Sequence, residues 1–126
     1  MLRISSAMFA KATLTVAIAG CAATTGPLSR QRLLDEGDEI CQAANNQIAA
    51  AQSNSTPRQL FRIYAESAQS IAELAANNGL DDIRILMARA EQAATFEGEA
   101  PTSLEALKLQ AVATEVRAAG FEVCGW

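Results

Sequence analysis

The chain contains no histidine, and this absence narrows its chemistry before any motif is considered. Histidine is the commonest general base and a frequent metal ligand, so histidine-based triads are excluded. Lys108 is the only lysine after residue 20, and nothing in the sequence selects a serine to pair with it in a Ser–Lys dyad. We therefore expect a protein that is not an enzyme and has no cofactor, metal or small-molecule substrate.

Aromatic residues and clusters of basic residues are also scarce. Aromatics make up 5% of the chain, too few to line a deep pocket. Arg3 and Lys11 are the only charged residues before Cys21, so the remainder carries 8 basic and 14 acidic residues, a balance of −6. An acidic surface without a basic patch repels phosphate, and we expect no nucleic-acid partner.

What is present begins with the pattern of an export signal. Arg3 and Lys11 give a basic start, and the run from Ala12 to Ala19 (ATLTVAIA) is uncharged and mostly apolar. Such a run is too short to cross a hydrocarbon core of about 30 Å as a helix. The sequence therefore predicts a signal segment over residues 1–20 rather than a membrane-spanning anchor.

The signal segment ends in Ile18-Ala19-Gly20-Cys21, an aliphatic residue and two small residues before a cysteine. Behind a basic start and a short apolar run, this tetrapeptide resembles the lipobox of bacterial lipoproteins. The resemblance implies that a diacylglyceryl group is joined to the Cys21 sulfur and that the chain is cut before Cys21. It also implies a membrane as partner, through a covalent lipid that holds far better than a single acyl chain.

The same resemblance suggests a location. In Gram-negative members of this family, a residue other than Asp after the lipidated cysteine usually accompanies transport to the outer membrane, and here that residue is Ala22. We expect a lipid-anchored protein of the cell envelope, on the periplasmic side of the outer membrane if the source is Gram-negative.

An ordinary secretory signal is the alternative, because Ala17-Ile18-Ala19 also fits the small-x-small cleavage pattern. That cleavage would export three cysteines and leave one unpaired in an oxidising compartment. Lipidation uses Cys21 and leaves an even pair, which favours the lipoprotein hypothesis.

The rest of the chain divides into a tether and one domain. Residues 21–30 contain small and polar residues broken by Gly26 and Pro27, as in flexible linkers. Residues 31–126 show helical spacing of apolar residues and no sustained β alternation. We expect an all-α fold, a four-helix up-down-up-down bundle, because the connections are short. The predicted helices run over about 29–53, from Pro57 to a stop at 77–79, from Asp81 to Phe96, and from Thr102 to Ala119.

Capping patterns support these boundaries. Thr56 with Gln59, and Thr102 with Glu105, have the spacing of capping boxes, and Asp81 is predicted to cap the third helix. Gly37 is expected to weaken the start of the first helix. Two further glycines are natural helix stops, Gly79 and Gly120. The apolar stripe of the first helix is predicted to be Ile40, Ala44, Ile48 and Ala51.

Cys41 and Cys124 are predicted to form a structural disulfide that ties the end of the chain to the first helix. A reactive thiol pair and a two-ligand metal site are the alternatives, but redox cysteines usually lie closer in sequence and a metal needs more ligands. The body also resembles small exported helical proteins of unknown function that pair a first-helix cysteine with a C-terminal Cys-Gly. The matching residues are Ile40-Cys41, Asn45 and Cys124-Gly125.

Three charged or apolar groups remain as candidate features. Asp35, Glu36, Asp38 and Glu39 are interpreted as the acidic start of a helix, with a cation-binding loop around Gly37 as the alternative. Arg58, Arg62, Glu66 and Glu73 are expected on a solvated face, with Arg62–Glu66 as an i,i+4 pair. Phe121, Val123 and Trp126 are expected to cover the end of the bundle, unless Trp126 is exposed as a partner contact.

These features together predict a non-enzymatic envelope lipoprotein that binds or scaffolds another envelope component. The alternative is a small effector or immunity lipoprotein that inhibits a toxin, a phage protein or a hydrolase at the membrane. An acidic domain suits a basic target, which is the reason to keep this alternative.

Overall fold

The computed structural model describes residues 27–125, and these form four helices with no strand. The predicted signal segment, the lipidation site at Cys21, the residue Ala22 and the terminal Trp126 lie outside the described residues. The all-α prediction is confirmed. The helices are α3 (Arg30–Ala51), α4 (Pro57–Asn77), α5 (Asp81–Ala93) and α6 (Ser103–Ala118), with a 3₁₀ turn η3 (Gln52–Asn54) after α3.

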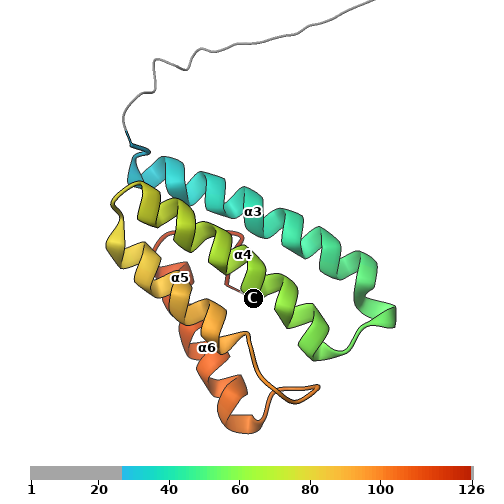
Figure 1. Ribbon diagram of the computed structural model, residues 1–126. Coiled ribbons are helices and arrows are strands. Elements are labelled where there is room, and N and C mark those ends of the chain that lie inside the picture. Colours follow the sequence, from blue (N-terminus) through green and yellow to red (C-terminus); the bar gives the residue numbers. More distant parts are fainter. Residues whose placement is uncertain (1–26, 126) are drawn as a thin grey trace, which may run out of the picture.

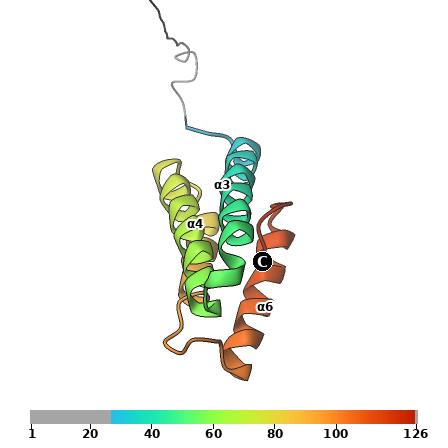
Figure 2. The same cartoon turned by 90° about the vertical axis from the view of Figure 1, so that its right-hand side faces the viewer.

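Each helix packs against the next one in the chain, α3 on α4, α4 on α5 and α5 on α6. Successive helices run in opposite directions, which is the predicted up-down-up-down order (Figure 1). The first described residues lie at one end of the bundle and the start of α6 lies at the other end (Figures 1 and 2). After α6, residues 119–125 return to α3, to which a disulfide joins them, and we call this stretch the C-terminal segment.

Both predicted capping boxes are present. Thr56 and Thr102 each accept a hydrogen bond from the backbone N–H three residues on, and Gln59 and Glu105 return a side-chain bond to the cap N–H. The predicted cap of α5 is wrong: Leu80 is the N-cap residue and makes no side-chain cap bond, while Asp81 lies in the first turn. There its charge still favours the helix, because the N-terminal end of the helix dipole is positive.

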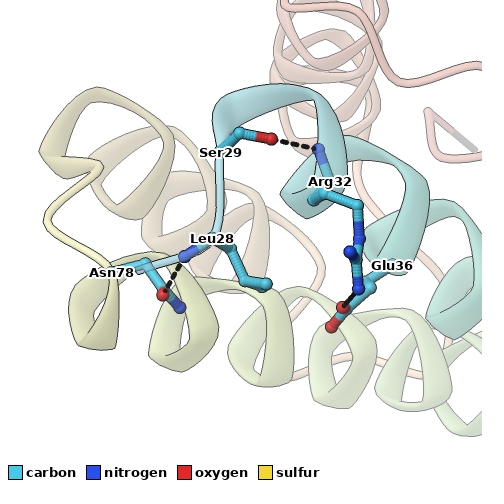
Figure 3. A network of polar contacts seen from close by, with 5 residues as sticks. All are labelled: Leu28, Ser29, Arg32, Glu36 and Asn78. Atoms are coloured by element: carbon cyan, nitrogen blue, oxygen red, sulfur yellow. Dashed lines mark hydrogen bonds and ion pairs between the residues drawn. The ribbon is translucent and has the colours of Figure 1, made fainter. Parts of the chain in front are cut away.

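The start of α3 is fastened to the rest of the body (Figure 3). The Ser29 hydroxyl accepts from the Arg32 N–H at 3.1 Å, and the Leu28 N–H donates to the Asn78 side chain at 2.7 Å. The same Asn78 side chain donates to the Leu74 carbonyl at 2.7 Å, so it links the end of α4 to the first described residues. Residues 28–30, which the sequence assigned to the tether, thus lie in the folded body.

The main core draws on all four helices and on the C-terminal segment. In α3 the buried face differs from the predicted stripe: Ala44 and Ile48 are buried, but Ile40 and Ala51 are only half-buried. The reason is that Leu33, Leu34 and Cys41 are also buried, so the buried stripe of α3 is centred on the side that carries them and not on Ile40. The largest fully buried side chains are Leu33, Ile71, Ile83, Met87, Val116 and the two bridged cysteines.

Candidate functional site

Cys41 and Cys124 form the predicted disulfide. Their Cα atoms are 5.3 Å apart, the S–S distance is 1.98 Å, and both side chains are almost completely buried. A buried bridge in the main core cannot present a thiol to a substrate or to a metal ion. The geometry therefore supports the structural role over the reactive pair and the metal site.

After the disulfide, Asp38 makes the second contact that holds the C-terminal segment against α3. Its carboxylate accepts hydrogen bonds from three successive backbone N–H groups, those of Glu122, Val123 and Cys124, with the shortest at 2.9 Å. These N–H groups follow the end of α6 and have no helical carbonyl to bind. One half-buried carboxylate thus satisfies a stretch of backbone that packs beside the disulfide.

The packing of Phe121 against Gly37 is the third contact between the C-terminal segment and α3. The Phe121 ring is buried and lies so close to α3 that a Cβ atom on residue 37 would be 2.5 Å from Phe121 Cε1. Gly37 therefore does not interrupt α3, as the sequence suggested, but opens the space that the ring fills. Gly120, whose φ of 116° is left-handed, ends α6 and turns the chain toward this space.

The acidic residues before Cys41 do not start a helix. α3 begins at Arg30, several residues earlier, and its first turn has no acidic residue, so that interpretation is wrong. The cation-loop alternative is not supported either, since all four residues lie on a continuous helix. They act separately: Asp35 accepts from Gln31, Glu36 pairs with Arg32, and Asp38 holds the C-terminal segment.

The predicted charged face of α4 is exposed, but the pair within it is wrong. Arg62 and Glu66 form no ion pair in the described structure, whose four salt bridges all join other residues. Arg58 instead donates from its guanidinium to the Glu97 carbonyl at 2.9 Å. This bond connects the start of α4 to the loop between α5 and α6.

Two exposed ion pairs join residues on different helices, 52 and 26 positions apart in the sequence. Arg30 binds Asp82 at 2.8 Å, and its hydrogen bond lowers the pKa of the Asp82 carboxyl. Arg89 binds both carboxylate oxygens of Glu115 at 2.8 Å, which lowers the pKa of Glu115 and raises that of Arg89. Solvent screens such pairs, so we treat them as restraints on helix orientation rather than as a functional site.

A small aromatic cluster that the sequence analysis missed lies at the end of the bundle away from residue 28. Phe61 contacts both Tyr64 and Phe96 with ring centroids 5.6 Å apart, and burial raises the pKa of the Tyr64 hydroxyl. The i,i+3 spacing of Phe61 and Tyr64 was the only sequence signal for this cluster. Beside it lies an open pocket of about 280 Å³ lined by Phe61, Pro101, Ala106, Leu109 and Gln110.

This pocket is poorly suited to a small molecule. Its volume falls just below the range of about 300–1,000 Å³ that is typical of ligand sites. Gln110 is its only residue with a polar side chain, so few groups are available to orient a ligand. In the described part of the chain, no three acidic, cysteine or histidine side chains lie together as a metal site. The side chain of Lys108 makes no hydrogen bond or ion pair with any residue between 27 and 125.

The most unusual surface is the exposed side of α6, opposite to its buried residues Leu109, Val112 and Val116. Leu104 and Leu107 are 61% and 62% exposed, the most exposed large apolar side chains in the described residues. We define the outer face of α6 as its five exposed uncharged residues at heptad spacing, Leu104, Leu107, Ala111, Thr114 and Ala118. The LxxLxxxAxxTxxxA spacing can be read from the sequence, but the sequence does not show that these side chains are exposed in the folded protein.

Comparison of the chain with protein-family models, with curated proteins and with solved structures finds no match. None of the helices between residues 27 and 125 is long and apolar enough to cross a membrane. Function must therefore be argued from the residues themselves.

Proposed function

We propose that this chain is a bacterial envelope lipoprotein, anchored through a lipid on Cys21, whose helical body is a non-enzymatic binding or scaffolding module. The observation that carries the proposal is the pairing of cysteines. The chain has three, and Cys41 and Cys124 bind each other, so the one left over is the cysteine of the lipobox-like sequence Ile18–Cys21.

The disulfide also supports export. Disulfides form and persist in oxidising compartments such as the bacterial periplasm and are rare in the cytosol. A buried bridge between the first helix and the chain end therefore fits a body that folds after leaving the cytosol.

The beginning of the body supports a tether from Cys21. Leu28 is held by Asn78, and six residues separate it from Cys21. Fully extended, a stretch of that length reaches about 20–25 Å, enough to clear the lipid headgroups. Because the starts of α3 and α6 lie at opposite ends of the bundle (Figure 1), an anchor at Cys21 on the α3 side would leave the start of α6 distant from the attachment point.

The anchor is tested by producing the full chain in a Gram-negative host and measuring the mass of the mature N-terminus. We expect cleavage before Cys21 and a diacylglyceryl adduct, both blocked by globomycin, and an outer-membrane location consistent with Ala22. Cys21→Ser is the matched control and should remain unprocessed by the lipoprotein pathway. A mature chain that begins at Gly20 without lipid would instead establish the ordinary secretory signal.

The binding role is tested by purifying the lipidated protein from native membranes after cross-linking. We expect an envelope protein to be recovered with the wild-type chain. The control is a chain in which residues 1–27 carry an unrelated soluble domain in place of this body, so that the anchor is the same and the body is absent. Recovery of the same proteins with both chains would show that the body does not select a partner.

Inhibition of a basic toxin or hydrolase is the second candidate function. The described residues carry 14 acidic and 8 basic side chains, and this excess favours a basic target. A toxin gene beside this one, and protection lost on deleting this gene, would favour that role over scaffolding.

A further inference from the structure

We propose that the outer face of α6 is a self-association surface, on which a second copy of this chain packs its own α6 in the opposite direction. All the residues concerned lie in the described part of the chain. The inference therefore does not depend on the lipid anchor or on the scaffolding role.

The first observation is the spacing of the exposed residues. Leu104, Leu107, Ala111, Thr114 and Ala118 are separated by three, four, three and four positions, the spacing of the a and d positions in a coiled-coil seam. Such a stripe stays on one side of a helix over its whole length and can pack into a matching stripe on another helix. A helix of 16 residues is about 24 Å long, so the stripe spans most of α6.

The second observation is that this seam is uncharged and not covered. All five residues are exposed, and the opposite side of α6 is already buried through Leu109, Val112 and Val116. α6 is therefore apolar on two opposite sides, unlike a surface helix with one apolar stripe. The other large apolar residue that is exposed, Ile85, is 50% exposed and lies on α5, separate from this seam.

The third observation is the order of large and small side chains along the seam. The leucines lie at the N-terminal end and the small residues at the C-terminal end. When two such helices run in opposite directions, Leu104 and Leu107 of one copy lie against Ala118 and Thr114 of the other. Large side chains then meet small ones along the whole contact, whereas a parallel pair would crowd leucines at one end and leave a gap at the other.

Charge complementarity also favours the antiparallel pair of identical helices. Lys108 and Glu115 flank the seam on the same side, three residues before and four residues after its centre at Ala111. An antiparallel pair centred there places Lys108 of each copy beside Glu115 of the other. Arg89 occupies one side of the Glu115 carboxylate, and a carboxylate has further acceptor sites. The opposite flank carries Gln110 and Arg117, which meet no like charge in this arrangement.

The test is sedimentation equilibrium of the full chain in mild detergent, at concentrations up to roughly 1 mM, which detects a dissociation constant of about that size. We expect twice the chain mass for the wild type and the chain mass for Leu107→Glu. Ile85→Glu is the matched control, an exposed apolar residue on another helix, and should remain a dimer. Circular dichroism and thermal unfolding should be unchanged in both variants, since each side chain is half or more exposed.

A charge reversal tests the direction of pairing. Lys108→Glu should raise the dissociation constant by about tenfold, because it places two carboxylates together. Adding Glu115→Lys together with Arg89→Glu should restore the wild-type value, since the pair between copies and the Arg89–Glu115 pair within each copy are both re-formed with their signs exchanged. A triple variant as weak as the single one would overturn the antiparallel arrangement.

The proposal as a whole is overturned by a wild-type chain that sediments as a monomer at roughly 1 mM, or by equal effects of Leu107→Glu and Ile85→Glu. A photo-crosslinking residue at position 107 gives the corresponding result in cells. A product of twice the chain mass supports the proposal, and a product with a different envelope protein in its place contradicts it.

Discussion

At the scale of single residues, the fold depends on Asp38 more than its position in an acidic run suggests. Its carboxylate accepts from three consecutive N–H groups of the C-terminal segment, while the neighbouring Asp35 accepts only from the exposed Gln31 side chain. The same type of side chain thus has very different roles at these two positions, because Asp38 lies on the side of α3 that faces the C-terminal segment and Asp35 lies on the exposed side.

We expect Asp38→Asn to lower the free energy of unfolding by about 1–3 kcal/mol, since an amide has a single carbonyl oxygen and no charge to offer three donors. Urea denaturation of the oxidised protein measures the change. Asp35→Asn is the control, and its effect should stay within about 0.5 kcal/mol, as for ordinary surface positions. Equal effects of the two substitutions would contradict the role of Asp38.

The second prediction at this scale concerns Gly37. In an exposed helix, Gly→Ala stabilises by roughly 1 kcal/mol. Here the new methyl group would lie 2.5 Å from a ring atom of the buried Phe121, so the ring or the helix must shift, and we expect Gly37→Ala to destabilise by about 1–3 kcal/mol. Thermal unfolding measures the sign. Phe121→Leu removes the ring atoms in question, so in that background Gly37→Ala should no longer be destabilising.

At the scale of helices, capping patterns predicted boundaries well and side-chain roles less well. Thr56 and Thr102 cap as their sequence neighbours indicate, because a capping box is a local structure and depends on residues three apart. The pair Arg62–Glu66 has an equally good local spacing but does not form. An exposed ion pair contributes little, so tertiary partners decide the conformation of such side chains.

Ion pairs between helices give a prediction that depends on pH. Hydrogen bonds from Arg89 lower the pKa of the Glu115 carboxyl in the folded state. The pair therefore contributes stability above the unfolded pKa of Glu115, and this contribution is lost as the pH falls through the lower folded pKa. Arg89→Gln should raise the pKa of Glu115 toward its ordinary value. NMR titration of the Glu115 carboxyl measures it, and Arg84→Gln, whose side chain pairs with Asp81, should leave it unchanged.

At the scale of the whole molecule, helical periodicity and short connections were enough to predict a four-helix bundle, because both are local properties. The C-terminal segment could not be predicted in the same way. The contact of Glu122 with Asp38 and the contact of Phe121 with Gly37 both join residues more than 80 positions apart, and no local pattern marks such contacts. Among the contacts of the C-terminal segment, only the disulfide could be predicted from the sequence, because the number of cysteines is known without the fold. The exposure of the outer face of α6 likewise follows from which helices pack together.

The disulfide joins distant parts of the chain by a covalent bond, and its removal is the last prediction. Cys41 and Cys124 are 83 positions apart, and closing a loop of that size in the unfolded chain corresponds to about 4–5 kcal/mol in the chain-entropy model. We expect the double variant Cys41→Ala with Cys124→Ala to lose up to this amount in urea denaturation. Against a net stability of about 5–15 kcal/mol for typical domains, the variant should be folded but marginal.

Reducing agent provides the control, since it should destabilise the wild type and leave the double variant unchanged. Because Asp38 and Gly37 of α3 contact the C-terminal segment without the bridge, we expect helix content to persist and the amides of Glu122 and Val123 to remain partly protected from exchange. Adding Asp38→Asn to the double variant should abolish that protection. Loss of protection on removing the bridge alone would show that the non-covalent contacts form only when the disulfide is present. Protection that survives until Asp38 is also changed would show that these contacts hold Cys124 in position without the bridge.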